Sequence, residues 1–242
     1  MNADPRATAL AVSARLVPRV GTRALDVAFE APAGITVLLG PSGSGKSTTL
    51  SAIAGLLTPD AGRIAVGGET WFDATTSTNL SVHHRRVAFV FQSLALFPHL
   101  TAAQNVAFGL ARRATRRSRQ QQVDAWLQRF RVGHLAGRKP GTFSGGEAQR
   151  VALARALATT PRVVLLDEPF SALDRPLRRE LAQEVRGLLR ELGVPVILVT
   201  HDREEARSMG DRFVLLDQGG RVMRSGAIGD LDEAQHGAED SV

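Results

Sequence analysis

The feature that most constrains this chain is a glycine-rich segment at residues 40–48, which fits the pattern G-x-x-x-x-G-K-[ST]. The apolar run at 35–39 predicts a buried strand before it, and Leu50, Ile53 and Leu57 recur at helical spacing after it. A strand, such a loop and a helix form a cradle for nucleotide phosphates, because backbone N–H groups turn inward and the helix N-terminus favours negative charge. The predicted cradle residues are Gly40, Pro41, Ser42, Gly43, Ser44, Gly45, Lys46, Ser47 and Thr48.

Two side chains of this loop have predicted chemical roles. Lys46 is expected to reach the β- and γ-phosphates, and Ser47 is expected to place its hydroxyl on Mg²⁺. A strand-to-helix turn with a chance lysine is the alternative, but both flanks of the segment fit the cradle.

Length and composition narrow the class of protein. The 242 residues suffice for one large or two small domains. No apolar run approaches roughly 18 residues, and residues 1–4 lack the charged start of a signal peptide, so we expect a soluble intracellular protein. The absence of cysteine excludes disulfides, thiolate zinc sites and cysteine nucleophiles. A net charge of +6 suits nucleic acid or an anionic membrane, although dispersed basic residues are typical of a solvated surface.

The first part of the chain predicts an antiparallel side sheet. Alternating apolar residues at 10–16 and 25–29 predict two strands, and a further strand at 63–66 follows the first helix. Residues 73–84 are polar and predict a loop, whereas the apolar run at 87–91 predicts a strand covered on both faces.

From 93 to 158 the periodicity becomes helical. Thr101 and Gln104 form a capping-box pattern, and 123–130 is amphipathic. A basic run at 112–119 is either a solvated helix end or a contact to phosphate, although no aromatic residue interleaves it. We therefore predict an inserted helical subdomain at 93–158, within a nucleotide-binding core that comprises 1–92 and 159–242.

A second helix start in this subdomain is predicted to receive an anion. Ser144 is placed to cap a helix whose N3 residue is Glu147. Gly145 and Gly146 expose the backbone amides of the first turn, which capping alone would not require. The sequence Thr160-Pro161 then ends the helix.

Two carboxylates follow the apolar strand predicted at 163–166. The carboxyl end of such a strand is where parallel sheets bind ligands. Asp167 suits Mg²⁺, directly or through water, and Glu168 suits a general base for an attacking water. Two capping acids before a proline turn are the alternative.

A histidine stands at the corresponding edge of the next predicted strand, 196–199. Beside bound phosphates, His201 can donate to the γ-phosphate, and otherwise it is a surface or capping residue. A last strand at 213–216 and a polar tail complete the prediction.

The chain resembles the ATPase subunits of ABC transporters over nearly its whole length. The order and approximate spacing match their Walker A, Q-loop, signature, Walker B, D-loop and H-loop motifs, which fall here at 40–48, Gln92, 144–147, 167–168, Asp174 and His201. Residues 85–100 look most like the ATPases of bacterial importers for molybdate, sulfate and related solutes. The resemblance implies an α/β fold, with a P-loop NTPase core on a mainly parallel sheet, an antiparallel β side sheet and the inserted helical subdomain.

The resemblance also implies site roles and cofactors. ATP and Mg²⁺ would be bound. The implied catalytic residues are Glu168, His201, Gln92 and Lys46. The implied metal-binding residues are Ser47, Gln92 and Asp167. The signature would serve the nucleotide of a second copy, in a head-to-tail homodimer, through Ser144, Gly145, Gly146 and Glu147.

By the same resemblance, a transmembrane permease would be the partner. Residues after Gln92, with Phe97 and Pro98, would dock its coupling helix. A solute-binding protein would be an indirect partner, nucleic acid would not be one, and the chain would lie on the inner face of the cell membrane, in the cytoplasm. Alternatives are a soluble ABC ATPase in translation or DNA repair, which usually carries paired domains or a coiled-coil insertion, and a P-loop metabolite kinase.

Three features differ from the family pattern. Phe143 replaces the usual signature leucine, where a packing role is expected. The aromatic residue that stacks on adenine is missing, because the chain has no tyrosine and Val20 occupies the corresponding place. The C-terminal regulatory domain of the relatives is also expected to be absent. The resemblance implies import of a solute such as molybdate or a related small anion, and selection of the cargo itself belongs to the partner proteins.

Overall fold

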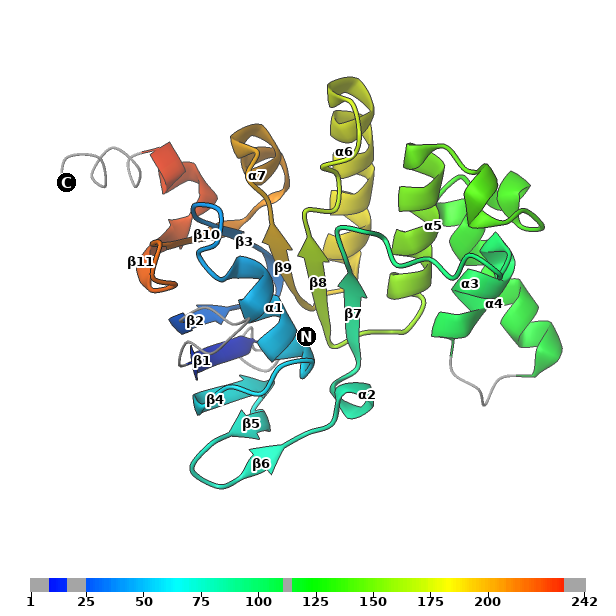
Figure 1. Cartoon of the computed structure of the whole chain (residues 1–242). Helices are drawn as coiled ribbons and strands as arrows, with labels where there is room; N and C mark the ends of the chain where they lie inside the picture. Colours follow the sequence, from blue (N-terminus) through cyan, green and yellow to red (C-terminus); the bar gives the residue numbers. More distant parts are fainter. Residues whose placement is uncertain (1–8, 17–24, 111–114, 233–242) are drawn as a thin grey trace, which may run out of the picture.

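The computed structural model describes residues 9–16, 25–110 and 115–232. It contains a six-stranded and a five-stranded sheet, with helix α1 against both (Figure 1). The larger sheet has the order β11-β10-β3-β9-β8-β7. Its strands are β3 (Gly34–Leu39), β7 (Val87–Val90), β8 (Val163–Asp167), β9 (Pro195–Val199), β10 (Arg212–Leu216) and β11 (Val222–Ala227).

The larger sheet is parallel from β10 to β7, and only β11 runs antiparallel, on β10. Strands β8 and β9 are buried along nearly their whole length, as their continuous apolar runs predict. Because parallel strands share one carboxyl edge, the loops after β3, β8 and β9 lie next to one another. This edge carries the candidate site.

The smaller sheet is antiparallel, with the order β2-β1-β4-β5-β6. Its strands are β1 (Leu10–Leu16), β2 (Leu25–Ala31), β4 (Ala61–Val66), β5 (Glu69–Asp73) and β6 (Thr78–Asn79). Alternate residues of β1 and β2 are buried, and Leu10 pairs with Ala31 in register. The predicted side sheet is therefore confirmed.

Helix α1 (Lys46–Ala54) fills the space between the sheets. Leu50 and Ile53 are fully buried in a cluster with apolar residues of both sheets. Arg85 is also buried, and its Nη1 donates at 2.8 Å to the carbonyl oxygens of Ala52 and Ile53. This arginine supplies a donor to the Ile53 carbonyl oxygen at the end of α1 and a second donor to that of Ala52, which also accepts the Gly55 N–H at 3.1 Å.

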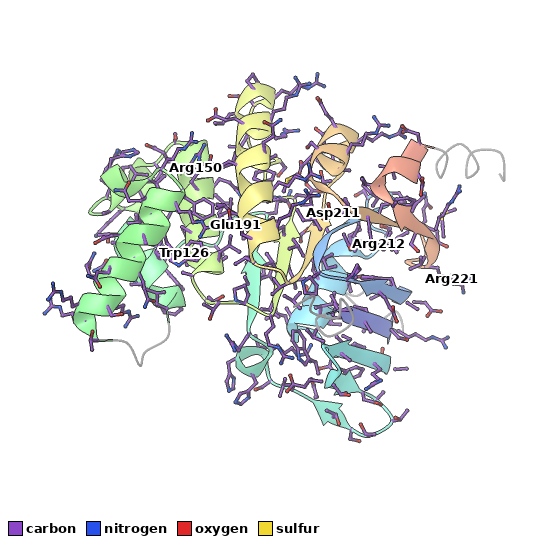
Figure 2. The ribbon with its side chains drawn as sticks, turned by 180° about the vertical axis from the view of Figure 1, so that it is seen from behind. Trp126, Arg150, Glu191, Asp211, Arg212 and Arg221 are labelled. Atoms are coloured by element: carbon purple, nitrogen blue, oxygen red, sulfur yellow. The ribbon has the colours of Figure 1, made fainter. Side chains whose placement is uncertain are left out.

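The opposite face of the larger sheet is covered by α6 (Arg175–Glu191) and α7 (Arg203–Met209). Leu181, Val185 and Leu189 form the buried side of α6. Figure 2 labels Arg150 and Glu191, which lie where the helices before β8 meet α6. There, Arg150 Nη1 donates to Glu184 Oε2 at 2.5 Å.

The segment between β7 and β8 is helical and lies beside β7 (Figure 1). Its elements are α3 (Ala102–Gly109), α4 (Arg116–Arg129), η2 (Gly133–Leu135), η3 (Pro140–Thr142) and α5 (Gly145–Leu157). The capping box of Thr101 and Gln104 is present at the start of α3. We propose that 93–158 is an inserted subdomain, although its apolar core continues into that of the larger sheet.

Two predictions of irregular structure are wrong. Residues 73–84 contain β6 and α2 (Val82–Arg85), which are too short to produce a periodic pattern. The expected polar tail contains β11 and η4 (Ile228–Asp230), and Leu231 is buried. β11 is a largely exposed edge strand whose two large apolar residues, Val222 and Met223, are adjacent, so it shows no alternation of apolar side chains.

Some predictions concern residues outside those described. They include Val20, residues 1–4, the turn at 21–22 and residues 112–114 of the basic run. Within the described ranges, every helix is too short or too polar to cross a bilayer.

Candidate active site

The loop between β3 and α1 depends on glycine at its two ends. Gly40 has φ +150°, and a Cβ there would lie 2.7 Å from Ser44 Oγ and 2.8 Å from the carbonyl oxygen of Leu216. Gly45, the N-cap of α1, has φ +88°. Both positions are costly for any other residue, so the loop conformation is specified by its sequence.

The first turn of α1 is left without internal partners. Its N-cap glycine has no side chain to accept a hydrogen bond, and no acidic residue lies in the turn. The free N–H groups and the helix dipole therefore favour an external anion.

Lys46 lies at this helix start, with only 9% of its surface exposed. Its Nζ donates to the carbonyl oxygens of Gly40 and Pro41 at 2.9 and 2.8 Å. Burial lowers the pKa of Lys46, and the charges of Glu168 and Asp167 oppose that shift. The ammonium group is thus held within the loop.

A cavity of about 610 Å³ opens above this loop, a size within the range of small-ligand sites. It is lined by Gly40, Ser42, Gly43, Gly45, Lys46, Ser47, Thr48, Leu57, Glu168, Val199 and His201. Seven of the nine predicted cradle residues are thus in its wall. Three of the four predicted catalytic residues, Lys46, Glu168 and His201, also line it, whereas Gln92 does not.

Ser47 and Asp167 lie together, since Ser47 Oγ donates to Asp167 Oδ1 at 3.1 Å. Burial raises the pKa of Asp167, and the hydrogen bond from Ser47 works against this. A hydroxyl and a carboxylate are oxygen ligands of the kind that Mg²⁺ takes alongside water and substrate phosphates. The residues present therefore fit this metal.

Glu168 lies between two polar side chains at the carboxyl edge of the larger sheet. Gln92 Nε2 donates to Glu168 Oε2 at 3.2 Å, and His201 Nδ1 lies 3.3 Å from Oε1. Glu168 has φ +46°, a left-handed conformation that is uncommon for residues other than glycine. Such strain persists where surrounding contacts over-determine it, and it clusters at functional sites.

The signature segment lies elsewhere. Ser144 Oγ accepts from the Glu147 N–H, and Glu147 Oε2 accepts from the Ser144 N–H, so the predicted capping box is present. This hydrogen bond from Ser144, with another from His134, lowers the pKa of Glu147 to about 2. Among the described residues that line the cavity, neither Ser144 nor Glu147 nor His134 is present.

The structure adds a packing reason for one signature glycine. A Cβ on Gly146 would lie 2.8 Å from Leu177 Cδ2, so the start of α5 approaches α6 closely. Phe143 is partly buried against the core, in line with the packing role expected of it. Asp174, in the predicted D-loop, caps α6 by accepting from the Leu177 N–H at 3.0 Å.

Sequence analysis did not single out Val199 or Arg178. Val199 lines the cavity as the last residue of β9. Arg178 lies behind the loops that carry Glu168 and His201 and contacts both loops. Arg178 is one of three arginines in the first five residues of α6, and nothing in the sequence separates it from its solvated neighbours.

A glycine-rich loop on a parallel sheet, with a lysine and paired carboxylates at the carboxyl edge, defines a P-loop nucleotide-binding protein. The family model described as ABC transporter matches residues 25–171. This chain therefore belongs to the ABC transporter family.

Curated relatives include the molybdenum import ATP-binding protein ModC of Brucella melitensis, which is 43% identical over 88% of this chain and 58% of its own length. The sulfate/thiosulfate import ATP-binding protein CysA of Yersinia pseudotuberculosis is 46% identical over 80% of this chain and 53% of its own. The chain thus spans only a little over half the length of these relatives.

Among solved structures, the dimeric structure of MJ0796, a bacterial ABC transporter cassette, has a TM-score of 0.76 and 31% identity, covering 91% of this chain and 98% of that one. The cbiO1 structure from Clostridium perfringens, part of the ABC transporter complex cbiONQ, has a TM-score of 0.80 and 25% identity, covering 96% and 93%. These matches support the predicted ABC ATPase fold.

Proposed function

We propose that this chain binds and hydrolyses ATP to drive solute import through a separate membrane permease. The observation that carries the proposal is the Glu168 carboxylate, held by Gln92 and His201 in the wall of a phosphate-binding cavity. A strained acidic residue beside an uncapped helix start suits a base acting on water next to bound phosphates.

In this proposal, separate groups of the chain bind the phosphates, hold the metal and move the proton. The amides of the α1 start and the Lys46 ammonium bind the phosphates. Ser47 and Asp167 would hold Mg²⁺, which when bound supplies positive charge to the phosphate oxygens. Gln92 would sense the metal and the attacking water. Glu168 takes the proton from water. His201, whose Nδ1 lies 3.3 Å from Glu168 Oε1, donates to the γ-phosphate.

We further propose a head-to-tail homodimer. Ser144, Gly145 and Gly146 begin a helix with open amides but do not line this copy's cavity. They are therefore available to the nucleotide of a second copy, and MJ0796, which is similar to this chain, is described as dimeric.

An apolar hollow supports permease docking at the membrane's inner face. It has a volume of about 390 Å³ and includes Phe97, Leu56, Val82 and Phe108. The last three are 54%, 45% and 65% exposed, and exposed apolar side chains that gather in one hollow are typical of a protein–protein contact. A coupling helix of a permease, itself served by a solute-binding protein, would cover this surface.

For the cargo we propose a small oxyanion such as molybdate, because the printed names of ModC and CysA refer to molybdenum and to sulfate or thiosulfate. Another relative, PotA of Pseudomonas fluorescens, is named for spermidine and putrescine import. Co-purification of the membrane partner from the native cell, followed by solute-uptake assays, distinguishes these cargoes.

ATP hydrolysis by purified protein tests the central proposal. We expect Glu168→Gln to retain ATP binding, to form a dimer with ATP and Mg²⁺, and to hydrolyse at least about 10²-fold more slowly. Glu191→Gln, which removes an exposed carboxylate paired with Arg129, is the control and should hydrolyse normally. Near-normal turnover by Glu168→Gln would refute the assignment of the base.

A further inference from the structure

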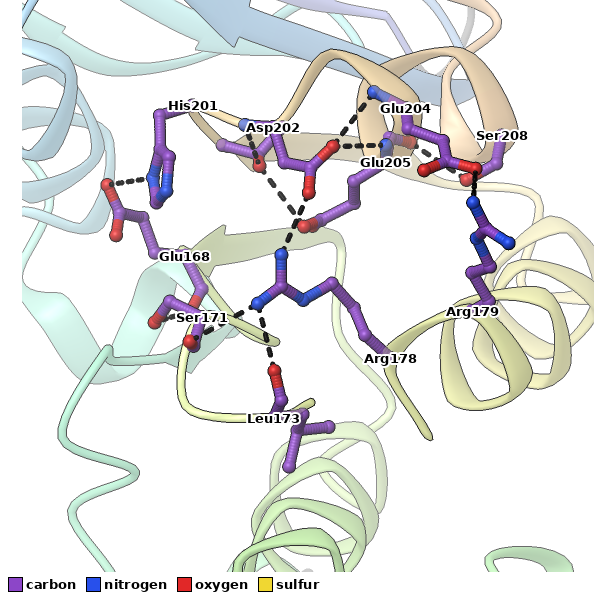
Figure 3. A network of polar contacts seen from close by, with 11 residues as sticks. Glu168, Ser171, Leu173, Arg178, Arg179, His201, Asp202, Glu204, Glu205 and Ser208 are labelled. Atoms are coloured by element: carbon purple, nitrogen blue, oxygen red, sulfur yellow. Dashed lines mark hydrogen bonds and ion pairs between the residues drawn. The ribbon is translucent and has the colours of Figure 1, made fainter. Parts of the chain in front are cut away.

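Arg178 occupies a junction between three elements of the site's supporting structure. It projects from the second turn of α6, and only 19% of its side chain is exposed. Figure 3 shows its guanidinium reaching toward the β8–α6 loop on one side and the β9–α7 loop on the other. These loops carry Glu168 and His201.

On the first side, Arg178 is bound to the backbone that follows Glu168. Its Nη2 donates to the carbonyl oxygens of Leu173 at 2.9 Å and Ser171 at 3.5 Å. Ser171 in turn donates to the Glu168 carbonyl oxygen from its Oγ at 3.0 Å and its N–H at 3.3 Å. The left-handed backbone of Glu168 is thus tied to Arg178 through one intervening residue.

On the second side, Arg178 Nη1 donates to Asp202 Oδ2 at 2.8 Å. Asp202 follows His201 directly, and its other oxygen accepts the N–H groups of Glu204 and Glu205 in the first turn of α7. Burial raises the pKa of Asp202, but those hydrogen bonds and the one from Arg178 outweigh it and hold the pKa below its usual value. The carboxylate therefore fixes both the helix start and the arginine.

These contacts close a ring. It runs from Glu168 through Ser171 to Arg178, on to Asp202 and its neighbour His201, and back to Glu168 across the 3.3 Å contact of the two side chains. Arg178 is the one member with hydrogen bonds to both loops, and a planar guanidinium holds several acceptors in fixed directions.

The adjacent Arg179 provides a natural comparison. It also joins α6 to α7, through an ion pair with Glu204, but its side chain is 64% exposed and that of Glu204 is 59% exposed. Exposed pairs of this kind contribute little. Figure 3 shows this pair on the side of the network away from Glu168.

We propose that Arg178 is a positioning residue that sets the relative placement of Glu168 and His201 for ATP hydrolysis. The proposal rests on the proposed ATPase function. Arg178 is absent from the wall of the cavity, so it acts through the two loops rather than on the nucleotide.

Steady-state ATPase kinetics of the full chain test this role. We expect Arg178→Gln to lower kcat at least about tenfold, because small displacements of reacting groups are costly, while KM for ATP changes less than twofold, since the phosphate loop is untouched. The matched control Arg179→Gln should leave both constants within twofold. The kcat is expressed per nucleotide-binding site, counted by ATP titration of each variant. A purely structural contribution would lower the melting temperature and the number of active sites, but it would leave this kcat per site within twofold.

A second variant keeps the test decisive if Arg178→Gln does not fold. Asp202→Asn retains a good cap for α7 but removes the charge that binds Arg178, and kcat should fall at least about threefold with KM unchanged. Equal kcat values for Arg178→Gln or Asp202→Asn and for Arg179→Gln overturn the inference. Absence of ATP hydrolysis by the unmodified protein would instead overturn the proposed function.

Discussion

Helices α1 and α5 both begin at glycine-rich segments, but their first turns are satisfied in opposite ways. α1 starts after a glycine, with no side-chain cap and no acidic residue. α5 starts with a complete capping box, in which Ser144 and Glu147 satisfy each other's N–H groups. The first arrangement leaves its donors for an external anion, whereas the second is stable by itself and retains only the amides of its two glycines for a ligand.

Their surroundings differ in the same sense. The α1 start forms the wall of the cavity beside a buried lysine, whereas the α5 start lies outside the cavity and against α6. We infer that α1 makes a nucleotide site within one copy and that α5 contributes only when another copy presents its nucleotide.

The largest expected effect separates binding from hydrolysis. Lys46→Ala and Ser144→Arg should each reduce ATP hydrolysis by at least about 10²-fold, because each disturbs a group that stabilises phosphate charge. Only Lys46→Ala should weaken nucleotide binding to the monomer, as measured by titration at low protein concentration.

Ser118→Arg, at the start of α4, is the control for added bulk and charge, and it should leave hydrolysis unchanged. If Ser144→Arg weakens nucleotide binding to the monomer as strongly as Lys46→Ala, α5 contributes to the nucleotide site of its own copy, and the inferred difference between the two helix starts is wrong.

A tenfold effect at most is expected for base selectivity. The described residues that line the cavity include no aromatic side chain apart from His201, so a nucleotide would be held mainly through its phosphates. Stacking on a ring is worth about 1–3 kcal/mol. GTP should therefore compete with ATP within about tenfold, or roughly 1.4 kcal/mol. Competition titrations that show a much stronger preference for ATP would indicate a stacking group outside these residues.

A smaller effect, on the free energy of unfolding, tests whether the capping box stabilises α5 without a ligand. Ser144→Ala removes the side-chain cap and should lower the free energy of unfolding by about 1 kcal/mol. Ser144→Asp retains an acceptor and should be close to the unmodified protein. Urea denaturation measures both changes, and equal stability of Ser144→Ala and the unmodified chain would show that the box does not stabilise α5.

The smallest effect is a dependence on pH. The pKa of Glu147 is about 2 in the folded chain and is ordinarily 4.5, so its ionised form stabilises the fold at pH values above 4.5. This contribution is lost as the pH falls from about 4.5 to about 2. The stability advantage of the unmodified protein over Glu147→Gln should shrink across that window in denaturation experiments, and an advantage that does not change with pH would contradict the assignment.

Much of this arrangement could be predicted from local sequence. Spacing alone identified both helix starts, because a phosphate loop and a capping box each need particular residues within a few positions. Strand β8 was equally clear, since an apolar run ending in two carboxylates has few alternative explanations.

The rest depends on contacts between distant segments. Arg85 is a charged residue of a type usually found at the surface. It is buried because the end of α1 brings two carbonyl oxygens to it. Arg178 likewise gains its partners only when the loops after β8 and β9 meet. β11 was missed because pairing with β10, rather than an apolar pattern, makes it a strand.

The strand order of the larger sheet also has a consequence for synthesis on the ribosome. β3 leads directly into the phosphate loop, but its neighbours are β9 and β10, which lie more than 150 residues later in the chain. By contrast, β1 pairs with β2 and with β4, and all three strands lie within the first 66 residues. The emerging chain can therefore form its side sheet early, while the loop waits unsupported until translation has passed residue 216, and such late, non-local pairing makes folding slow.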